Sequence, residues 1–571
     1  MPKIKSLIQL IFVFIFGFSL LGISAASTSA DTLSWSIVNI PADGPTGKWV
    51  LAAGSDVRCL TLSPDGTLYC WANPTGTLSV NPYRLFKSTD QGVSWAYTGR
   101  VEDIIVDIAV IPGNAQQVYY ATPSRVYRSD DAGENFRLIG DCPGGAGTVE
   151  VEITSMDVTS MAGVNHVIIG TRDNDALEFG GVYTLEENES PAWSNTAAGN
   201  YDFVAVAFSP DFASDRQLIA IGTDEHDTVI TTNTNQAGWN VAVGDARLTG
   251  INAAAAAIAF PADYEAGVLD RYTQFVAINT GTGHGGVFRL EGSAGPIASQ
   301  ATDLKARGSD GENNLDITGL AVSGNASAAN ILVGMAAIAQ TCFSSDGGTH
   351  WQISQKSPSG ESQTCIALAS NFAAGGLAFA ATSGSESAFS ISRDQGQTWD
   401  QTGLIDTKIT TILDVAASPD YSRDATLLML TADQQDSVWR STNAGQVWER
   451  IFSTTQAHPA RIDQVLLSPQ YGENTRILLS GTREGSPVIW ESRNGGDNFT
   501  PTPSTDAQTG APVNVDAWAI TPGDVLFAAG FDGNEAVVYQ TSGGGLTYVD
   551  KAHCGNLPIN SLAVSPDFVS D

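Results

Sequence analysis

The chain has 571 residues, 58 of them glycine, and carries a formal net charge of −33 from 61 acidic and 28 basic side chains. This excess of acidic groups repels nucleic acids and anionic membrane surfaces, and it excludes a role in binding either. Apolar residues make up 42% of the chain and charged residues 16%, which suits a folded protein of many short strands and tight turns. At this length, several domains or an array of repeats are expected.

The N-terminal 30 residues have the features of a secretory signal peptide. Met1–Lys5 is basic, Leu7–Ile23 is apolar, and small residues that fit a cleavage site follow. We therefore predict a signal peptide at 1–30, a mature region at 31–571 and a secreted or cell-surface protein. An uncleaved membrane anchor is the alternative. Beyond this stretch, no apolar run is long enough to span a bilayer.

One eight-residue pattern recurs along the chain, with Ser at position 1, Asp or Asn at 3, Gly at 5 and Trp or Phe at 8. Its six clear copies begin at Ser88, Ser129, Ser344, Ser392, Ser441 and Ser492, and a degenerate copy ends at Tyr548. The Asp or Asn side chain accepts hydrogen bonds from the backbone amides that follow, and Gly adopts a backbone conformation that strains other residues. The aromatic residue enters the next strand and can be buried there. The pattern predicts a turn between antiparallel strands, and we favour this structural role over a ligand site.

This S-x-D-x-G-x-x-W pattern resembles the Asp-box, or BNR, repeat of sialidase-type β-propellers. The same repeat occurs in sortilin-type receptors, xyloglucanase-type glycoside hydrolases and photosystem II assembly factors. The resemblance covers nearly the whole mature region and implies a propeller fold. It implies little about function, because the boxes of the family are turns on the scaffold, away from its active centres.

A second signal lies between these octapeptides. It is a Ser-Pro-Asp turn, in which proline presets the first central backbone angle and Asp favours the next position. This turn occurs at Ser63, Ser209, Ser418 and Ser565, with variants at Pro261 and Ser468. Nearly continuous apolar runs recur with it, as expected for strands buried on both faces between stacked sheets. The ten runs begin at Leu68, Gln117, His166, Gln217, Phe275, Ile331, Leu377, Thr426, Arg476 and Val525.

The spacing of these runs, roughly 50 residues, is close to the length of one propeller blade. We therefore predict an all-β fold, a β-propeller built from about ten four-stranded blades with Asp-box turns. Two arrangements fit: one large ring, or a seven-blade ring plus part of a second, with a split near 401–410. Leu33–Pro41 is expected to be an outer strand, and the Ala-rich Ile251–Phe260 an inner strand. Because Ile559–Asp571 stops inside a turn, we expect the C-terminus to be truncated within a further repeat.

Six cysteines fit an oxidising compartment. They are Cys59, Cys70, Cys142, Cys342, Cys365 and Cys554. Cys59 and Cys70 flank a turn and can face each other across a hairpin to form a disulfide, and Cys342 with Cys365 is a second candidate pair. The alternative is that some of the six are buried small apolar residues, and the pairing stays open.

Sequence motifs of known chemistry are missing. The Arg-Ile-Pro signature of sialidases is absent, and the nearest string is Arg461-Ile462-Asp463. No acidic pair matches the catalytic segments of xyloglucanase-type enzymes. The histidines lack the paired spacing of zinc ligands; they are His166, His226, His284, His350, His458 and His553. We therefore predict no catalytic residue, no cofactor-binding residue and no metal ligand.

Two acidic loops are candidates for calcium. The first places oxygen-bearing side chains at alternate positions, which are Asp310, Glu312, Asn314 and Asp316. It lacks the glycine and glutamate that an EF-hand requires. The second is Asp224–Asp227. For both we favour a solvated acidic loop over a calcium site, and no cofactor is predicted.

These observations predict a secreted, non-catalytic cell-envelope or surface protein, of which a surface-layer component is one form. Its propeller faces would bind a partner protein, a polysaccharide or further copies of the chain. One alternative is a carbohydrate-active glycoside hydrolase of the xyloglucanase or sialidase-like type, which predicts acidic pairs converging beside exposed tryptophans. Another is an assembly factor of the photosystem II type, which predicts a single modest ring with a basic patch; the length and charge of the chain count against it.

Overall fold

The computed structural model describes residues 37–568 with several gaps. The residues not described within this range are 45–47, 74–83, 145–150, 176, 189–190, 240–244, 267, 269–270, 293–299, 309–310, 312–314, 456–459, 524, 542–546 and 566–567. The chain divides into Met1–Asn39 and Ile40–Asp571, and the second part contains all the sheets. The predicted signal peptide at 1–30 lies outside the described residues. Within the described part, no helix is both long enough and apolar enough to cross a membrane.

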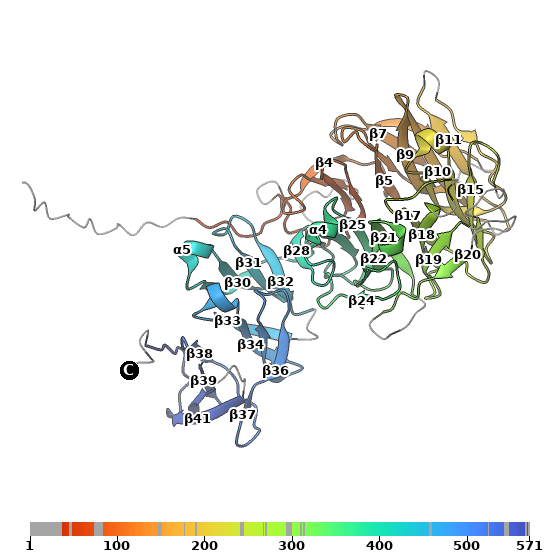
Figure 1. Cartoon of the computed structure of the whole chain (residues 1–571). Helices are drawn as coiled ribbons and strands as arrows, with labels where there is room; N and C mark the ends of the chain where they lie inside the picture. Colours follow the sequence, from red (N-terminus) through yellow and green to blue (C-terminus); the bar gives the residue numbers. More distant parts are fainter. Residues whose placement is uncertain are drawn as a thin grey trace, which may run out of the picture. The chain divides into compact units, whose positions relative to one another are not determined.

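Nearly all regular structure is antiparallel β-sheet, in ten groups of four strands that follow one another along the chain (Figure 1). We call these groups blades 1 to 10. Blades 1 to 4 are β1 (Arg58–Leu62), β2 (Leu68–Ala72), β3 (Arg84–Ser88), β4 (Ala96–Arg100); β5 (Asp107–Val110), β6 (Val118–Ala121), β7 (Arg125–Ser129), β8 (Arg137–Asp141); β9 (Val151–Met161), β10 (Val164–Asp173), β11 (Val182–Glu186), β12 (Ser194–Asn195); β13 (Asp202–Phe208), β14 (Leu218–Thr223), β15 (Thr228–Asn233) and β16 (Ala246–Leu248).

Blades 5 to 7 are β17 (Ala255–Ala259), β18 (Thr273–Asn279), β19 (Gly286–Glu291), β20 (Gln300–Asp303); β21 (Ile317–Ser323), β22 (Asn330–Met335), β23 (Thr341–Ser344), β24 (Gln352–Ile353); β25 (Ser362–Leu368), β26 (Ala378–Ser383), β27 (Phe389–Ser392) and β28 (Asp400–Gly403). Blades 8 to 10 are β29 (Thr411–Ala417), β30 (Leu427–Ala432), β31 (Asp436–Ser441), β32 (Glu449–Ser453); β33 (Ala460–Leu467), β34 (Ile477–Arg483), β35 (Ser486–Ser492), β36 (Thr500–Pro503); β38 (Ala517–Ile520), β39 (Leu526–Phe531), β40 (Ala536–Gln540) and β41 (Thr547–His553). A short strand, β37 (Thr505–Asp506), pairs in parallel with β41.

The predicted all-β propeller fold is confirmed. The ten apolar runs that the sequence predicted as buried strands are the second strands of the ten blades, from β2 to β39. Residues of β2 and β6 are buried throughout, as expected for strands covered on both faces. The Ala-rich segment forms β17, an innermost strand, as predicted.

Each hydrophobic cluster joins two neighbouring blades, which are consecutive in the chain except where blade 7 meets blade 1. The cluster around Tyr119 and Ile169, for example, lies between blades 2 and 3, and the cluster around Leu430 and Leu479 lies between blades 8 and 9. Because every blade is covered by its neighbours, the apolar core runs between the sheets rather than inside a single one.

Blades 1 to 7 close into a ring. The first strand of each blade contacts the first strand of the next, and β25 of blade 7 contacts β1 of blade 1. The cluster at this closure, which we call the seam, includes Trp95 and Phe389, whose ring centroids are 4.8 Å apart. The segment before blade 1 reinforces the seam, since Leu404 N donates to Trp49 O at 3.0 Å and Ala52 N to Ile405 O at 2.8 Å. Two arrangements were predicted, and these contacts match the second, a seven-blade ring with further blades.

Blade 7 also contacts blade 8. The outer strands β28 and β32 pair at Gln401 and Arg450, and a cluster containing Ala388, Met429 and Trp439 lies beside that edge. The first strand of blade 8, β29, contacts β33, yet its Ile412, Leu413 and Val415 are 45%, 40% and 57% exposed. The division near 401–410 and the truncated C-terminus remain predictions.

All six octapeptides form the turn between the third and fourth strands of a blade, and they share one hydrogen-bond pattern. The Ser hydroxyl donates to the Asp or Asn oxygen at 2.7–2.9 Å and accepts from the Gly amide at 2.8–2.9 Å. The same Asp or Asn oxygen accepts from the amide four residues later at 2.8–3.0 Å. Trp95, Trp399 and Trp448 are buried, while the other three aromatic residues are half-buried. In the degenerate copy that ends at Tyr548, residues 542–546 lie outside the described residues.

Two local predictions need correction. Four of the connections that follow Ser-Pro-Asp or a related sequence are single-turn helices: α3 (Phe212–Asp215), α4 (Phe372–Gly375), α5 (Tyr421–Asp424) and α6 (Tyr471–Asn474). In α5, the Ser418 hydroxyl donates to Asp424 at 2.6 Å and accepts from the Asp420 amide, which closes one helical turn. The predicted outer strand at Leu33–Pro41 is wrong for its described residues, 37–41, which form no strand. Ile37 is 95% exposed.

Two half-buried aspartates link the inner strands of neighbouring blades. Asp107 accepts hydrogen bonds from Ile108 N and, across the blade boundary, from Met156 N at 3.0 Å. Asp157 accepts in the same way from Val158 N and Phe208 N. Burial raises the pKa of Asp107 to about 7 and that of Asp157 to about 6, although the amide hydrogen bonds oppose the rise.

We expect the octapeptide turn to stabilise its blade measurably. Asp394→Ala removes an acceptor for Ser392 Oγ, Thr398 N and Thr398 Oγ1, and should lower the free energy of unfolding by about 1–3 kcal/mol. Asp394→Asn is the matched control, because Asn443 holds the same position in blade 8 and accepts from the Ser hydroxyl and from the amide four residues later. Denaturant unfolding measures both variants, and equal stability of Asp394→Ala and the wild type would contradict the role assigned to the turn.

The raised pKa of Asp107 should make the stability of the protein depend on pH. The folded chain keeps its proton up to about pH 7, whereas the unfolded chain loses it near about pH 4. In this window the folded state binds more protons, so the free energy of unfolding falls as pH rises. Asp107→Asn should reduce the dependence of the thermal unfolding midpoint on pH in this window. Asp131→Asn should not, because hydrogen bonds from Asn135 lower the pKa of Asp131 to about 2.

Candidate functional site

A loop after β24 extends from blade 6 to blades 7, 8 and 9. Lys356 lies in this loop, and its ammonium group donates to Asp400 at 2.5 Å, to Ile451 O at 3.3 Å and to Gly496 O at 3.2 Å. One buried cation therefore bonds to an outer strand of blade 7, an outer strand of blade 8 and the octapeptide turn of blade 9. Such a cation ties the three blades together at one point.

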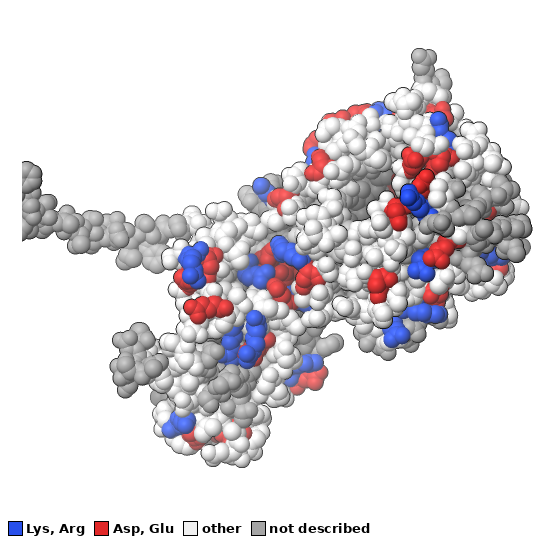
Figure 2. Space-filling model, viewed as in Figure 1, with Lys and Arg blue, Asp and Glu red and all other residues white. Residues whose placement is uncertain are grey.

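Asp400 is shared with a second cation, Arg440 of β31. The Arg440 guanidinium contacts Asp400 and Glu449 at 3.0 Å each and Asp497 at 3.2 Å. Burial opposes the charge of Arg440, but the three carboxylates outweigh it and raise the pKa of Arg440 above its ordinary value. Figure 2 shows side chains of both charges gathered where β28, β31 and β32 meet. This network fixes the edge at which blades 7 and 8 join.

A third pair, Arg450 and Glu386, is the most deeply buried. The Arg450 side chain is 0% exposed and that of Glu386 is 6% exposed, and they lie 2.9 Å apart. Arg450 also donates to Gln401 Oε1 and to Ser359 Oγ. Glu386 has a left-handed backbone with φ of 61°, a conformation that strains a residue other than glycine. A strained backbone that holds a buried charge is typical of functional sites.

Two of these charged groups, Lys356 and Glu386, line a cavity of about 580 Å³, which we call the junction cleft. Its wall is formed by the loop after β24, the β26–β27 turn that carries Glu386, and residues of blades 8 and 9. The lining residues are Ala339, Gln355, Lys356, Ser357, Pro358, Ser359, Gly360, Glu361, Ser385, Glu386, Gln435, Phe452, Thr455, Asn498 and Phe499. A shallower hollow of about 270 Å³ shares Ser385, Glu386 and Gln435 with it, so the cleft continues toward Asp406 and Lys408.

The lining of the junction cleft combines aromatic rings with hydrogen-bonding groups. Phe452 and Phe499 meet edge to face, with ring centroids 5.0 Å apart. Gln355, Gln435 and Asn498 supply amides that both donate and accept hydrogen bonds. Aromatic rings provide apolar contact area, and amides and carboxylates bind hydroxyl groups. The cleft therefore has the chemistry to hold a polyhydroxylated ligand with apolar faces.

The acidic loops predicted as calcium candidates have other roles where they are described. Asp310, Glu312 and Asn314 lie outside the described residues. Asp316 accepts hydrogen bonds from Thr280 N, Gly283 N and Gly285 N. Burial alone would raise the pKa of Asp316, but these bonds outweigh it and lower that pKa. Its carboxylate thus caps the β18–β19 turn.

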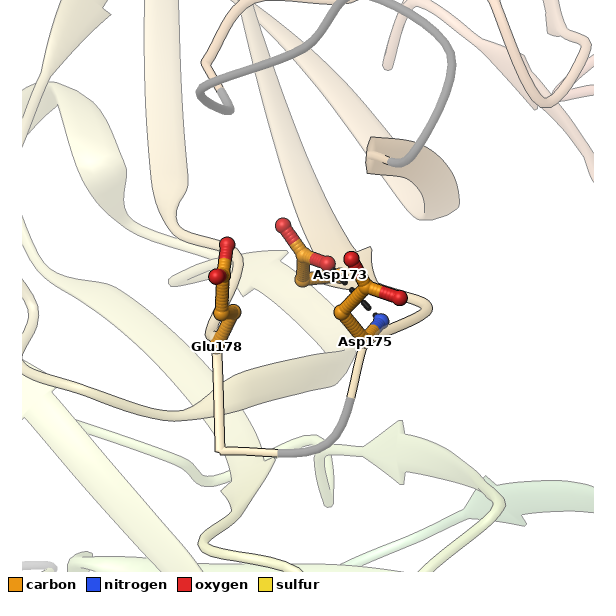
Figure 3. Close-up of side chains that lie close together, drawn as sticks. All are labelled: Asp173, Asp175 and Glu178. Atoms are coloured by element: carbon orange, nitrogen blue, oxygen red, sulfur yellow. Dashed lines mark hydrogen bonds between the residues drawn. The ribbon is translucent and has the colours of Figure 1, made fainter.

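The carboxylates of the second acidic loop, Asp224–Asp227, form ion pairs with an arginine. Arg247 forms ion pairs with Asp224 and, at 2.7 Å, with Asp227, which also accepts from Gly250 N. In the part of the chain that the structure describes, the group of acidic side chains arranged to hold a metal is a different one, Asp173, Asp175 and Glu178 after β10 (Figure 3). There, Asp173 already accepts from Asp175 N at 2.9 Å.

Sequence reasoning missed the residues of the junction cleft. Lys356, Glu386 and Arg450 belong to no motif, and they come together only because blades 6 to 9 meet. In the structure, Gly360 of the loop after β24 lies where an added Cβ would fall 2.6 Å from Thr382 Cβ, a contact that the sequence alone does not reveal. A glycine in this tight position indicates a loop held against the next blade.

Comparison with known protein families finds no match, and comparison with curated proteins finds none. Among solved structures, the chain is similar to a Niastella koreensis GH74 enzyme, with 16% identity and a TM-score of 0.28 over 86% of this chain and 68% of that one. It is also similar to YCF48 from Cyanidioschyzon merolae, with 15% identity and a TM-score of 0.37 over 57% of this chain and 92% of that one. An ancestral GH74 enzyme is similar at 13% identity, with a TM-score of 0.29 over 86% and 72% of the two chains. At these values the similarities assign neither an activity nor a partner to this chain.

We expect the Arg450–Glu386 pair to contribute strongly to the stability of the junction. Arg450→Met leaves Glu386 as an unpaired buried charge and should lower the free energy of unfolding by about 3–5 kcal/mol. The double variant Arg450→Met/Glu386→Gln should recover much of this loss. Arg461→Met, which removes an exposed ion pair, should cost at most about 1 kcal/mol. Denaturant unfolding measures all three, and an Arg450→Met variant as stable as Arg461→Met would contradict the assignment.

Proposed function

We propose that this protein is a secreted, non-catalytic binding propeller of the cell envelope or surface, whose junction cleft binds a neutral polysaccharide. The single observation that carries the ligand class is the lining of the cleft. The half-buried Phe499, held edge to face by the buried Phe452, offers apolar ring area beside the amides of Gln355, Gln435 and Asn498, and all five residues line the cleft. Sugar rings present apolar faces and hydroxyl edges, and this lining matches both.

The charge of the protein supports a neutral ligand rather than an acidic one. The net charge is −33, and Glu361 at the rim of the cleft is exposed. Both disfavour uronic-acid or phosphate groups on the ligand. Lys356, which lines the cleft, and Arg450, which pairs with Glu386 of its lining, are already engaged in ion pairs. They therefore have little capacity left to bind an anionic ligand.

Export rests on the N-terminal sequence. The basic, apolar and small-residue regions within 1–30 fit a signal peptide. We further propose that the octapeptide turns are Asp-boxes in the sense of the propeller family, because all six form the same hydrogen bonds around Ser, Asp or Asn, and Gly. This assignment concerns the scaffold, and the ligand class does not depend on it.

A glycoside hydrolase is the second candidate, because two carboxylates, Glu361 and Glu386, line the same cleft. Hydrolysis needs one carboxyl group as acid and another as base or nucleophile. Glu386 is already committed, since it pairs with Arg450 and accepts from Ser453 and Thr455 hydroxyls at 3.4 Å. Glu361 Oε2 accepts from Ser385 N at 3.2 Å. This commitment of both groups favours binding over turnover.

The proposal is tested by calorimetric titration of the full chain with a soluble neutral β-glucan and its oligosaccharides. Phe499→Ala removes half of the aromatic pair in the cleft and should weaken binding by about tenfold or more. Phe136→Ala is the control, since Phe136 holds the same octapeptide position in blade 2, away from the cleft. It should leave the affinity unchanged.

The same samples are assayed for the release of reducing ends. If the wild type releases reducing ends and Glu361→Gln does not, the function is hydrolysis rather than binding. Absence of binding to any neutral glucan, or equal affinity of Phe499→Ala and the wild type, would contradict the junction cleft as the site.

A further inference from the structure

The seam of the ring brings together thiols from opposite ends of the seven-blade chain. Cys70 of β2 belongs to the hydrophobic cluster at the seam and is 0% exposed. Cys365 of β25 packs against the same cluster from blade 7 and keeps part of its surface exposed. These two residues are far apart in sequence but share one hydrophobic cluster, because blade 7 closes onto blade 1.

A β-bulge in β1 lies beside both thiols. In β1, the register shifts between Arg58 and Leu60, so that Cys59 is the extra residue and Leu60 pairs with Cys70. The Cys365 thiol lies against the backbone amides of Cys59 and Leu60. Since Leu60 pairs with Cys70 and also packs on the seam cluster, the thiols of Cys365 and Cys70 lie on the same side of β1.

Cys59 points elsewhere. Its thiol donates to Ile105 O at 3.4 Å and to Val106 O at 3.6 Å, and its side chain packs between blades 1 and 2. Cys342, which the sequence offered as a partner for Cys365, donates to Arg307 O at 2.7 Å and packs between blades 5 and 6. Neither of the two pairings offered by the sequence is formed, and all six cysteines are free thiols in the structure.

We propose that Cys70 and Cys365 form a disulfide across the seam, which locks the seven-blade ring covalently when the protein is in an oxidising compartment. The reaction requires an oxidant with a disulfide bond. The more exposed thiolate, Cys365, attacks that disulfide, forms a mixed disulfide and releases one thiol. The Cys70 thiolate then attacks the Cys365 sulfur and releases the second thiol. The two cysteines together lose two protons and two electrons, and the electrons reduce the oxidant.

Such a bond would reinforce a closure that is otherwise non-covalent. It would join residues roughly 300 positions apart, and long enclosed loops gain the most from a cross-link. The closure now depends on ring contacts such as that of Trp95 with Phe389, and on the parallel segment at Trp49–Ala52. A disulfide there would keep blades 1 and 7 together even when these contacts open.

The test incubates the purified full chain with oxidised glutathione and then measures its intact mass under denaturing conditions. The proposal expects a loss of about 2 Da, corresponding to two hydrogen atoms, that dithiothreitol reverses. The thermal midpoint of the oxidised chain should rise by about 5 °C relative to the reduced chain.

Variants assign the pair. Trypsin leaves Cys59 and Cys70 in one peptide, 59–84, and Cys365 in another, so peptide mapping alone does not separate them. Cys70→Ala should abolish both the cross-linked peptide and the thermal shift, whereas Cys59→Ala should keep both. If the wild-type chain loses no mass, the proposal is overturned, and no variant is needed to show it. A cross-link that survives in Cys70→Ala and disappears in Cys59→Ala would overturn the assignment to Cys70.

Discussion

Mutual coverage of neighbouring blades is the constraint on which the rest of this structure depends. A single four-stranded sheet such as blade 2 has two apolar faces, and its second strand is buried on both. Each hydrophobic cluster accordingly draws on two blades, as Tyr119 and Ile169 do between blades 2 and 3. A ring covers both faces of every blade, because it has no first or last face. Where coverage is incomplete, as on β29, apolar side chains such as Val415 remain exposed.

The same constraint explains why the fold could be predicted from the sequence. A strand buried on both faces is a nearly unbroken apolar run, and the runs from Leu68 to Val525 mark one strand in every blade. The octapeptide turns were equally readable, because Ser, Asp or Asn, and Gly complete their hydrogen bonds within seven residues of chain. Local chemistry and periodicity therefore determined the elements. The single-turn helices, such as α5, were missed because a Ser-Pro-Asp start fits a plain turn equally well.

The junction cleft could not be predicted in this way, because its interactions connect parts of the chain far apart in sequence. Arg450 pairs with Glu386 across 64 positions, and Lys356 bonds to Gly496 across 140. Nothing near Lys356 in the sequence distinguishes it from a solvated surface lysine. Its role follows only from the branch at blade 7, which packs on blade 1 to close the ring and on blade 8 to continue the chain. That branch leaves polar edges facing each other, and these edges bound the cleft.

The way the ring closes also imposes an order on folding. Trp49 precedes every blade, yet it packs in the seam with Phe389 and Leu404, which come roughly 350 residues later. At about 5–20 residues per second of synthesis, these partners follow on the order of tens of seconds afterwards. During that interval the indole ring and the open side of blade 1 must be shielded in another way. A chaperone that holds the nascent chain would meet this need, and closure would then occur in one late step.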